Sequence, residues 1–288
     1  LYLENPANCR VKAIKRCASV LVGTLVRRFG QTANVTTAAL HLLHKYEHVP
    51  PHLADVLEVV ATEFEGGAQV VSRTVRELAR LDAEDLAREG TLAKNAAALL
   101  CELAERVPRL LLPSVPVLLP HLEHGESYVL RNGIVQAIGA IALRIFRDEQ
   151  DASQASNHDH HNNNNSDDDE DNSGVRHGDA AATSDTLVGV LEGRVLDVSA
   201  YSRSKVLQTL VPLVAERAVP LRRFYPLAEL AVGRLSDKAA QVRRSALLLL
   251  RTAVQFNPYA ATVTTSLFQR KLAQCGAIFD AIEQSPTA

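Results

Sequence analysis

Three histidines in the first fifty residues have the spacing of metal ligands. His41, His44 and His48 recur at intervals of three and four residues beside Glu47, so a helix would place the imidazoles on one face. Such a site would define a helical metalloenzyme. However, the H-E-x-x-H string that supplies a water-activating glutamate is absent, and a Pro-Pro pair follows at once. We therefore interpret these residues as surface and half-buried histidines of an amphipathic helix. A helical metalloenzyme ranks below the two non-catalytic hypotheses given at the end of this section.

Other catalytic signatures are absent from the sequence. It contains no G-x-S-x-G, no G-x-x-x-x-G-K-[ST] and no G-x-G-x-x-G, the common nucleophile, phosphate and dinucleotide motifs. The four cysteines, Cys9, Cys17, Cys101 and Cys275, are scattered without a C-x-x-C pair. This spacing argues against a zinc site and a disulfide framework, and it suits a reducing compartment. We expect a chain that is not an enzyme and uses no cofactor, no metal and no small-molecule substrate.

Basic residues are the remaining candidates for function. Arginine pairs occur at 27–28, 222–223 and 243–244. The candidates for contact with DNA or a protein partner are Arg10, Lys12, Lys15, Arg16, Arg27, Arg28, Lys205, Arg222, Arg223 and Arg244. In a curved stack of repeats, equivalent positions fall in a line, and a line of cations would follow a phosphate backbone without reading bases. The alternative interpretation is an ordinary solvated polar face.

The average charge conceals a division along the chain. The net charge is −2, yet residues 148–185 carry eleven acids and one arginine. Residues 1–30 hold six Lys or Arg against one acid, and residues 201–251 hold ten against three. The part outside 148–185 is therefore mildly basic, which favours an anionic partner. The 148–185 stretch is rich in Asn, Asp and His, and its first part, 148–174, is almost free of apolar residues, so we expect the insertion to be disordered.

The elements that must position these cations follow a repeat of 40 residues. Asp197 precedes Arg203 by six residues, and Asp237 precedes Arg243 by the same interval. After each arginine, apolar residues fall at offsets of 3, 4, 7 and 11, which mark one face of a helix. A turn with Asp, a basic residue and an apolar helical face, repeated at this period, is the HEAT pattern.

The same offsets follow Arg131 and Arg10, in helices expected over 128–145 and 10–29. Arg131 lies 72 residues before Arg203, which is one period lengthened by the acidic insertion. The repeat-signature residues are Arg131, Asp197, Arg203, Asp237 and Arg243. We expect a structural role for them, in which Arg203 and Arg243 tie the inter-helix turn to the aspartate of the same or the next unit.

The remaining pattern completes an all-α chain. We expect further helices from Asn34 (an N-cap) to Pro50-Pro51, and over 52–64, 70–81, 94–106, 110–122 and 264–282. Pro212 falls inside the helix after Arg203, so we expect a kink or break near Leu210. The predicted fold is a HEAT-repeat α-solenoid of about six helix pairs. Residues 1–147 hold N-terminal HEAT-like pairs, 148–185 the disordered insertion, and 186–288 further HEAT repeats.

The sequence begins at Leu1 and contains no methionine, so we expect it to be a fragment of a longer chain. No apolar run approaches the roughly 18 residues that span a membrane, and no signal peptide is visible. We expect no membrane partner.

Six stretches carry a family resemblance. They are AALHLLHKYEHVPPHLAD (38–55), VRELARLD (75–82), LLPHLEHGESYVLRN (118–132), LDVSAYSRSKVLQTLVPL (196–213), VPLRR (219–223) and LAVGRLSDKAAQVRRSALLLL (230–250). In this order and combination they resemble the first non-SMC subunit of condensin, the larger HEAT-repeat regulatory subunit of condensin I. The resemblance covers most of the chain outside 148–185 and falls on the N-terminal to middle portion of the family. The insertion, Pro212 and Ser202 depart from its pattern.

The resemblance implies a non-catalytic subunit of a complex that pairs SMC ATPases with a kleisin chain and two HEAT subunits, and that condenses mitotic chromosomes. By resemblance, the chain would dock on the kleisin and SMC subunits and touch DNA or chromatin, with histones as a further candidate. ATP hydrolysis would belong to the SMC partners, and the protein would occur in the nucleus, on chromosomes and in the cytoplasm. The second hypothesis is another HEAT or armadillo adaptor, such as a transport receptor or phosphatase scaffold, which binds peptides rather than DNA.

Overall fold

The computed structural model describes residues 2–81, 90–123, 127–159 and 173–261, and it contains helices and no strand among them. The helices are α1 (Pro6–Cys9), α2 (Lys12–Phe29), α3 (Thr32–Lys45), α4 (Val49–Glu63), α5 (Gly67–Ala79), α7 (Gly90–Arg106), α8 (Pro108–Leu111), α9 (Val115–Glu123), α10 (Tyr128–Asp159), α11 (Ser173–Arg194), α12 (Ala200–Ala215), α13 (Leu221–Gly233) and α14 (Ala240–Gln255). Short 3-10 turns are η1 (Leu112–Ser114), η2 (Arg234–Ser236) and η3 (Pro258–Ala261).

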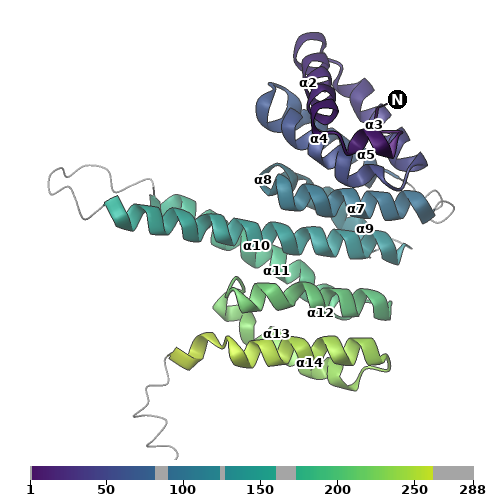
Figure 1. The fold of residues 1–288 in the computed structure, drawn as a ribbon. Coiled ribbons are helices and arrows are strands. Elements are labelled where there is room, and N and C mark those ends of the chain that lie inside the picture. Colours follow the sequence, from purple (N-terminus) through teal and green to yellow (C-terminus); the bar gives the residue numbers. More distant parts are fainter. Residues whose placement is uncertain (1, 82–89, 124–126, 160–172, 262–288) are drawn as a thin grey trace, which may run out of the picture.

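The helices are stacked in chain order along one column (Figure 1). In one layer α2, α4, α7, α10, α12 and α14 lie side by side in that order. In the second layer α3 packs on α5, α5 on α8 and α9, and α11 on α13. Two layers of helices stacked in chain order form an α-solenoid, because each helix pair contacts mainly its neighbours. The prediction of an all-α solenoid is confirmed.

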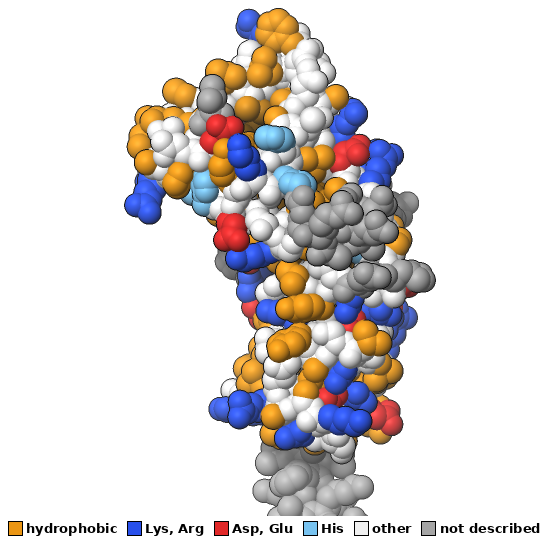
Figure 2. Space-filling model, turned by 90° about the vertical axis from the view of Figure 1, so that its right-hand side faces the viewer, with side chains coloured by type: hydrophobic (Ala, Val, Ile, Leu, Met, Phe, Trp, Pro, Cys, Tyr) orange, Lys and Arg blue, Asp and Glu red, His pale blue; other side chains and the backbone are white. Residues whose placement is uncertain are grey.

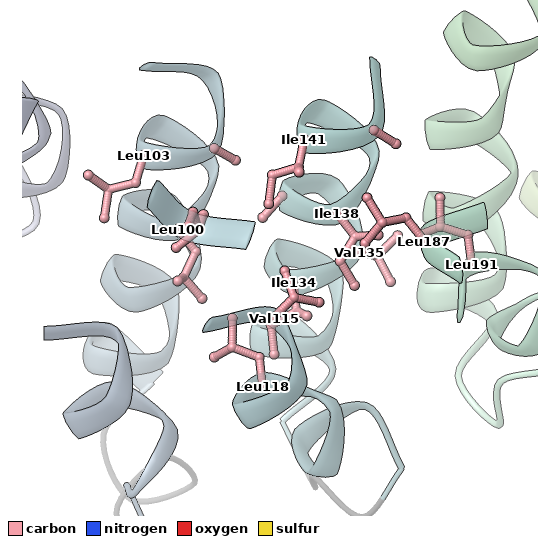
Figure 3. Packing of buried hydrophobic residues seen from close by; sticks show 14 of the residues in the cluster. Leu100, Leu103, Val115, Leu118, Ile134, Val135, Ile138, Ile141, Leu187 and Leu191 are labelled. Carbon is pink, nitrogen blue, oxygen red and sulfur yellow. The ribbon is translucent and has the colours of Figure 1, made fainter. Parts of the chain in front are cut away.

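Aliphatic side chains fill the space between the helices, and α10 lies at the centre of this core. Figure 3 shows the isoleucines of α10 between leucines of α7 and leucines of α11. The labelled residues are Leu100, Leu103, Val115, Leu118, Ile134, Val135, Ile138, Ile141, Leu187 and Leu191. Full burial of one such side chain stabilises the fold by about 1.5–3 kcal/mol. The core is therefore continuous along the stack rather than centred on one globule.

Glycines allow α10 to approach both of its neighbours. A Cβ atom on Gly133 would lie 2.4 Å from the Cβ of Ala97 in α7. A Cβ atom on Gly139 would lie 2.1 Å from the Cγ2 of Thr209 in α12. Carbon atoms do not pack this closely, so the observed spacing of the three helices depends on the missing side chains.

The repeat offsets mark buried faces in the middle of the stack, as predicted. All eight residues at these offsets from Arg131 and Arg203 are at most 2% exposed. They are Ile134, Val135, Ile138 and Ala142 in α10, and Val206, Leu207, Leu210 and Val214 in α12. The prediction is therefore confirmed for these two helices. Their predicted faces are buried because each helix has a neighbour on either side in its layer.

The same offsets are wrong for α2 and for part of α14. Leu21, at an offset of 11 from Arg10, is 62% exposed, and the buried positions of α2 include Gly23 and Val26 instead. Val254, at the same offset from Arg243, is 80% exposed. These are the first and last helices of their layer within the described residues, so each is covered on one side only. The covered face is set by the neighbours that are present.

Two helix boundaries differ from the prediction. α3 begins at Thr32, so Asn34 lies inside the helix and does not cap it; its amide donates to the side chain of Gln31. Pro50 and Pro51 do not end that helix, which stops at Lys45. They belong to the first turn of α4, where a proline costs little because the N–H groups of a first turn have no intrahelical partner.

Pro212 does not break its helix. We expected a kink or a break near Leu210, and of these the break is absent, because α12 continues from Ala200 to Ala215 without interruption. Only the last turn follows the proline, and Leu210, Leu213 and Val214 are buried around it. Packing of these side chains offsets the missing backbone hydrogen bond.

The predicted insertion is helical at both of its described ends. α10 extends to Asp159 and α11 begins at Ser173. Asp148 forms an ion pair with Arg109, and Asp185 is buried against arginines of α13. The composition of the segment predicts that these acids are solvated, whereas the structure pairs them with arginines that are distant in the sequence. Residues 160–172, and the helix expected over 264–282, lie outside the described residues.

Candidate protein and nucleic-acid interface

The repeat-signature residues form an Arg–Asp ladder, which consists of Arg131, Asp197, Arg203, Asp237 and Arg243. The Nε of Arg131 in α10 lies 3.2 Å from Oδ2 of Asp197, before α12. Arg203 in α12 donates through Nε and Nη2 to the two carboxylate oxygens of Asp237, at 2.8 and 2.9 Å. Each of these arginines therefore reaches the aspartate of the next repeat.

Arg203, Arg243 and the two aspartates also close the turn of their own repeat. Arg203 Nη1 donates to the backbone carbonyl of Asp197 at 2.8 Å, and Arg243 Nη1 donates to that of Asp237 at 2.8 Å. The Asp197 carboxylate accepts the backbone N–H of Ser199 at 2.8 Å, at the start of α12. Arg203 realises both alternatives left open by the sequence, because it binds carbonyls of its own unit and the carboxylate of the next. Arg243 binds carbonyls of its own unit.

Apart from Arg243, which is exposed, the ladder is buried or nearly so. The side chains of Arg203 and Asp237 are 15% and 3% exposed. Hydrogen bonds from Arg203 hold the pKa of Asp237 below its ordinary value, although burial opposes this shift. Removal of one partner of such a pair leaves an uncompensated buried charge, which is strongly destabilising. Arg131 and Arg203 therefore join successive repeats through Asp197 and Asp237, and these four residues are engaged within the fold.

The arginine pair at 222–223 joins two helices as well. Arg223 donates to both oxygens of Asp185, at 2.6 and 2.8 Å, and to Glu192 at 2.6 Å. Arg222 donates to the same Asp185 at 2.7 Å, yet its side chain remains 72% exposed. Hydrogen bonds from Arg223 and Arg222 hold the pKa of Asp185 well below its usual range. The pair therefore links α13 to α11, and Arg223 in particular is occupied.

Two of the predicted cations of α2 are likewise engaged. Lys15 forms an ion pair with Asp55 of α4, and Asp55 also accepts from Arg106 of α7 at 2.9 Å. Arg16 binds both carboxylate oxygens of Glu63 in α4, at 2.6 and 2.7 Å. Burial acts to raise the pKa of Asp55, but the hydrogen bonds from Lys15 and Arg106 outweigh it and lower that pKa. This side of α2 is attached to the stack.

The other predicted cations are at least partly exposed and form no ion pair within the described chain. They are Arg10, Lys12, Arg27, Arg28, Lys205 and Arg244. Lys205 lines a cavity of about 310 Å³ with Gln136 and Gln208, between α10 and α12. In Figure 2 the Lys and Arg side chains of one end of the stack are interspersed with apolar and acidic ones. On this face the cations are spread out rather than gathered into one basic surface.

The histidines of the proposed metal site do not converge. His41 and His44 are exposed on α3, whereas His48 precedes α4 with its Nε2 3.0 Å from the backbone oxygen of Leu3. Across the described ranges, no group of three or more His, Cys, Asp and Glu side chains is placed to hold a metal ion.

Sequence reasoning missed a second group of cations, which we call the arginine groove. Arg73 and Arg76 of α5, and Arg80 directly after it, line a cavity of about 520 Å³. Its other lining residues are Gln69, Glu77, Gly30 before α3, and Thr32 and Ala33 at the start of α3. The arginines' spacing of three and four residues in the SRTVRELAR string is visible in the sequence and would have indicated a shared helix face. The groove itself could not be predicted from the sequence, because it depends on the position of α3 opposite α5.

One described helix is long and apolar enough to cross a membrane by composition alone. This is the Tyr128–Ala152 part of α10, and 61% of its most apolar window is buried inside the fold. α10 packs against α7, α11 and α12, so its apolar character is explained by its central place in the core.

Two layers of stacked helices, joined by an Arg–Asp ladder at the period of the repeat, define an α-solenoid of the HEAT type. No family model matches the chain. Curated relatives do: condensin complex subunit 1 of Mus musculus is 31% identical over 264 residues, and that of Homo sapiens 30% over 264 residues. The condensin-1 complex subunit CAP-D2 of Arabidopsis thaliana is 30% identical over 272 residues.

These alignments cover 91–94% of this chain and 17–18% of the relatives. The chain is therefore similar, over nearly its whole length, to a segment of condensin complex subunit 1. The resemblance that the six sequence stretches indicated is confirmed.

Proposed function

We propose that the chain is part of a non-catalytic scaffold subunit of a condensin-type complex, which binds other subunits and contacts DNA. The observation that carries this proposal is the similarity to condensin complex subunit 1 across 91% of the chain. The stacked helices support it, because a solenoid exposes a long surface for partners and its repeats contact mainly one another. The chain spans 17% of the mouse relative, so the roles of the whole protein are extrapolated to it.

In this role the chain binds the kleisin and SMC subunits, and the SMC ATPases supply the chemistry. The proposed role also covers mitotic chromosome condensation, with a location in the nucleus and on chromosomes, and in the cytoplasm as well. The relatives are named as subunits of the condensin complex, which supports membership of a multi-subunit assembly.

Contact with DNA or chromatin would use the cations that the fold leaves free. Arg10, Lys12, Arg27, Arg28 and Arg244 are exposed and form no ion pair among the described residues. Cations of this kind bind phosphates without reading bases, so the expected contact is independent of DNA sequence. Arg222 keeps an exposed side chain despite its bond to Asp185, so it remains a candidate as well.

A HEAT or armadillo adaptor that binds peptides rather than DNA is the second candidate. It is favoured by one observation, namely that Lys15, Arg16, Arg222 and Arg223 are paired with acids of neighbouring helices. These four are among the ten predicted cations, and their pairing reduces the positive surface available to a polyanion.

Two measurements test the proposal. The purified chain is mixed with a tagged kleisin subunit of condensin, and co-purification is expected. Binding to a fluorescent DNA duplex is then measured from low to physiological salt, where counterion release predicts a steep loss of affinity. Failure to bind the kleisin would reject the condensin role. Retained kleisin binding with no DNA binding at low salt would reject the DNA contact alone.

A further inference from the structure

Within the described residues, the arginine groove carries an excess of positive charge. Arg73 and Arg76 are exposed and form no ion pair within the described residues, and Arg76 donates only to a backbone carbonyl, at 3.3 Å. Arg80 has one acidic partner, Glu77, at 3.0 Å. Among the described residues that line the groove, there are thus three guanidinium groups and one carboxylate, which pairs with Arg80. Guanidinium groups bind carboxylates through paired hydrogen bonds, so the groove suits an acidic ligand.

The three arginines line the same cavity. One helical face carries all three arginines, because Arg73 and Arg76 of α5 and Arg80 at its C-terminal end are three and four residues apart. The opposite wall includes Thr32 and Ala33 from the first turn of α3, which contains no acidic residue. The dipole of α3 adds a small positive potential at this N-terminal end, which favours an anionic ligand.

A second, apolar groove lies across the α2–α3 turn from the first. It has a volume of about 560 Å³, and its walls include Leu25 and Phe29 of α2 and Val35 of α3. Leu53 and Leu57 of α4 also line it. The turn residues alternate between the two sites: Phe29, Gln31 and Asn34 line the apolar groove, while Gly30, Thr32 and Ala33 line the arginine groove. The two grooves are therefore adjacent.

The pairing of the grooves identifies the kind of ligand that would fill both. We propose that they together bind one segment of a partner protein in which acidic residues stand beside large apolar ones. DNA would satisfy the arginines, but it has no aliphatic side chains to cover an apolar groove in which Phe29 is 64% exposed. A polypeptide supplies both chemistries from neighbouring residues. This inference deepens the proposed scaffold role and rests on it.

The test uses a fluorescein-labelled synthetic peptide in which leucine pairs alternate with glutamate pairs, and a matched peptide with glutamine in place of glutamate. Fluorescence anisotropy measures their binding to the full chain. In the variant R73E/R76E, affinity for the acidic peptide should fall at least about tenfold, since two attractive contacts become repulsive. The variant R73K/R76K keeps the charge and should retain most of the binding.

Controls separate this surface from general charge. R244E/R251E makes the same change in charge on exposed arginines of α14 and should leave peptide affinity within about twofold. Phe29→Ser should weaken both peptides, because it removes an apolar wall. All variants change exposed side chains, and circular dichroism checks that they remain folded.

Several results would overturn the inference. These are no binding of the acidic peptide to the unmodified chain, equal binding of the glutamate and glutamine peptides, or the same affinity in R73E/R76E. A fourth is that R73E/R76E weakens binding of a DNA duplex and leaves the peptide unaffected, which would assign the groove to nucleic acid. A chain that fails this test and still co-purifies with the kleisin keeps its proposed scaffold role.

Discussion

Arg203 and Asp237 lie 34 positions apart in the sequence and bind each other through two parallel hydrogen bonds, at 2.8 and 2.9 Å. The third nitrogen of the same guanidinium closes the turn before α12 by bonding the carbonyl of Asp197. One side chain thus fixes the geometry within its own repeat and the contact with the next. A solenoid is stabilised by contacts between neighbours, so this arginine should have a large effect on the stack.

Substitution of Arg203 by alanine should therefore lower the free energy of unfolding by about 3 kcal/mol, because it leaves Asp237 buried without its partner. Denaturant unfolding gives the free energy, and amide hydrogen exchange shows whether α14 loses protection. Arg243→Ala is the matched control. It loses the same kind of carbonyl bonds, but Arg243 has no carboxylate partner within the described residues. Equal losses in the two variants would show that the carboxylate contact adds nothing.

Acid should destabilise the chain through its paired aspartates. The pKa values of Asp185 and Asp237 are lowered in the folded protein by hydrogen bonds from arginines. A carboxyl group with a lowered folded-state pKa stabilises the fold fully above its unfolded pKa of about 3.9, and this stabilisation is lost as the pH falls below that value. The thermal midpoint should drop steeply below about pH 4. D185N/D237N should be less stable at neutral pH and less sensitive to acid; an unchanged acid profile would contradict this account.

Gly133→Ala should destabilise the chain, although alanine is normally the better helix former. The new Cβ would lie 2.6 Å from the Cα of Ala97, so the backbone of α7 or α10 must move. Overpacking of this kind costs about 1–3 kcal/mol. Gly193→Ala is the control, since a Cβ there meets nothing within 4 Å, and it should stabilise the helix slightly. Thermal unfolding of both variants checks the prediction, which fails if they shift in the same direction.

The arginine pairs at 27–28 and 222–223 should behave differently when their charge is reversed. Arg223→Glu places an acid beside Asp185 and Glu192, and it should reduce stability by about 1–2 kcal/mol. R27E/R28E changes exposed residues and should leave stability unchanged. If these two contact phosphates, R27E/R28E should also lower the salt dependence of DNA binding by about two counterions. Unaltered DNA affinity at low salt would remove Arg27 and Arg28 from the DNA contact.

The sequence alone determined the class of fold and the middle of the stack. Helical periodicity is a local property, so the faces of α10 and α12 could be predicted from Arg131 and Arg203. The interval of six residues between Asp and Arg likewise specified a structural pair, because it spans one turn and the start of a helix. The family resemblance depended on strings such as GESYVLRN, which are also local.

Only the tertiary structure decided which cations are available to a partner. Arg223 and Arg27 look alike in sequence, and they differ because Asp185 lies 38 positions from Arg223 and is brought to it by packing of α11 on α13. The exposure of Leu21 and Val254 was decided in the same way, by which neighbours cover α2 and α14. The physical reason is that local periodicity makes a helix, whereas burial and ion pairing depend on contacts between residues far apart in the chain.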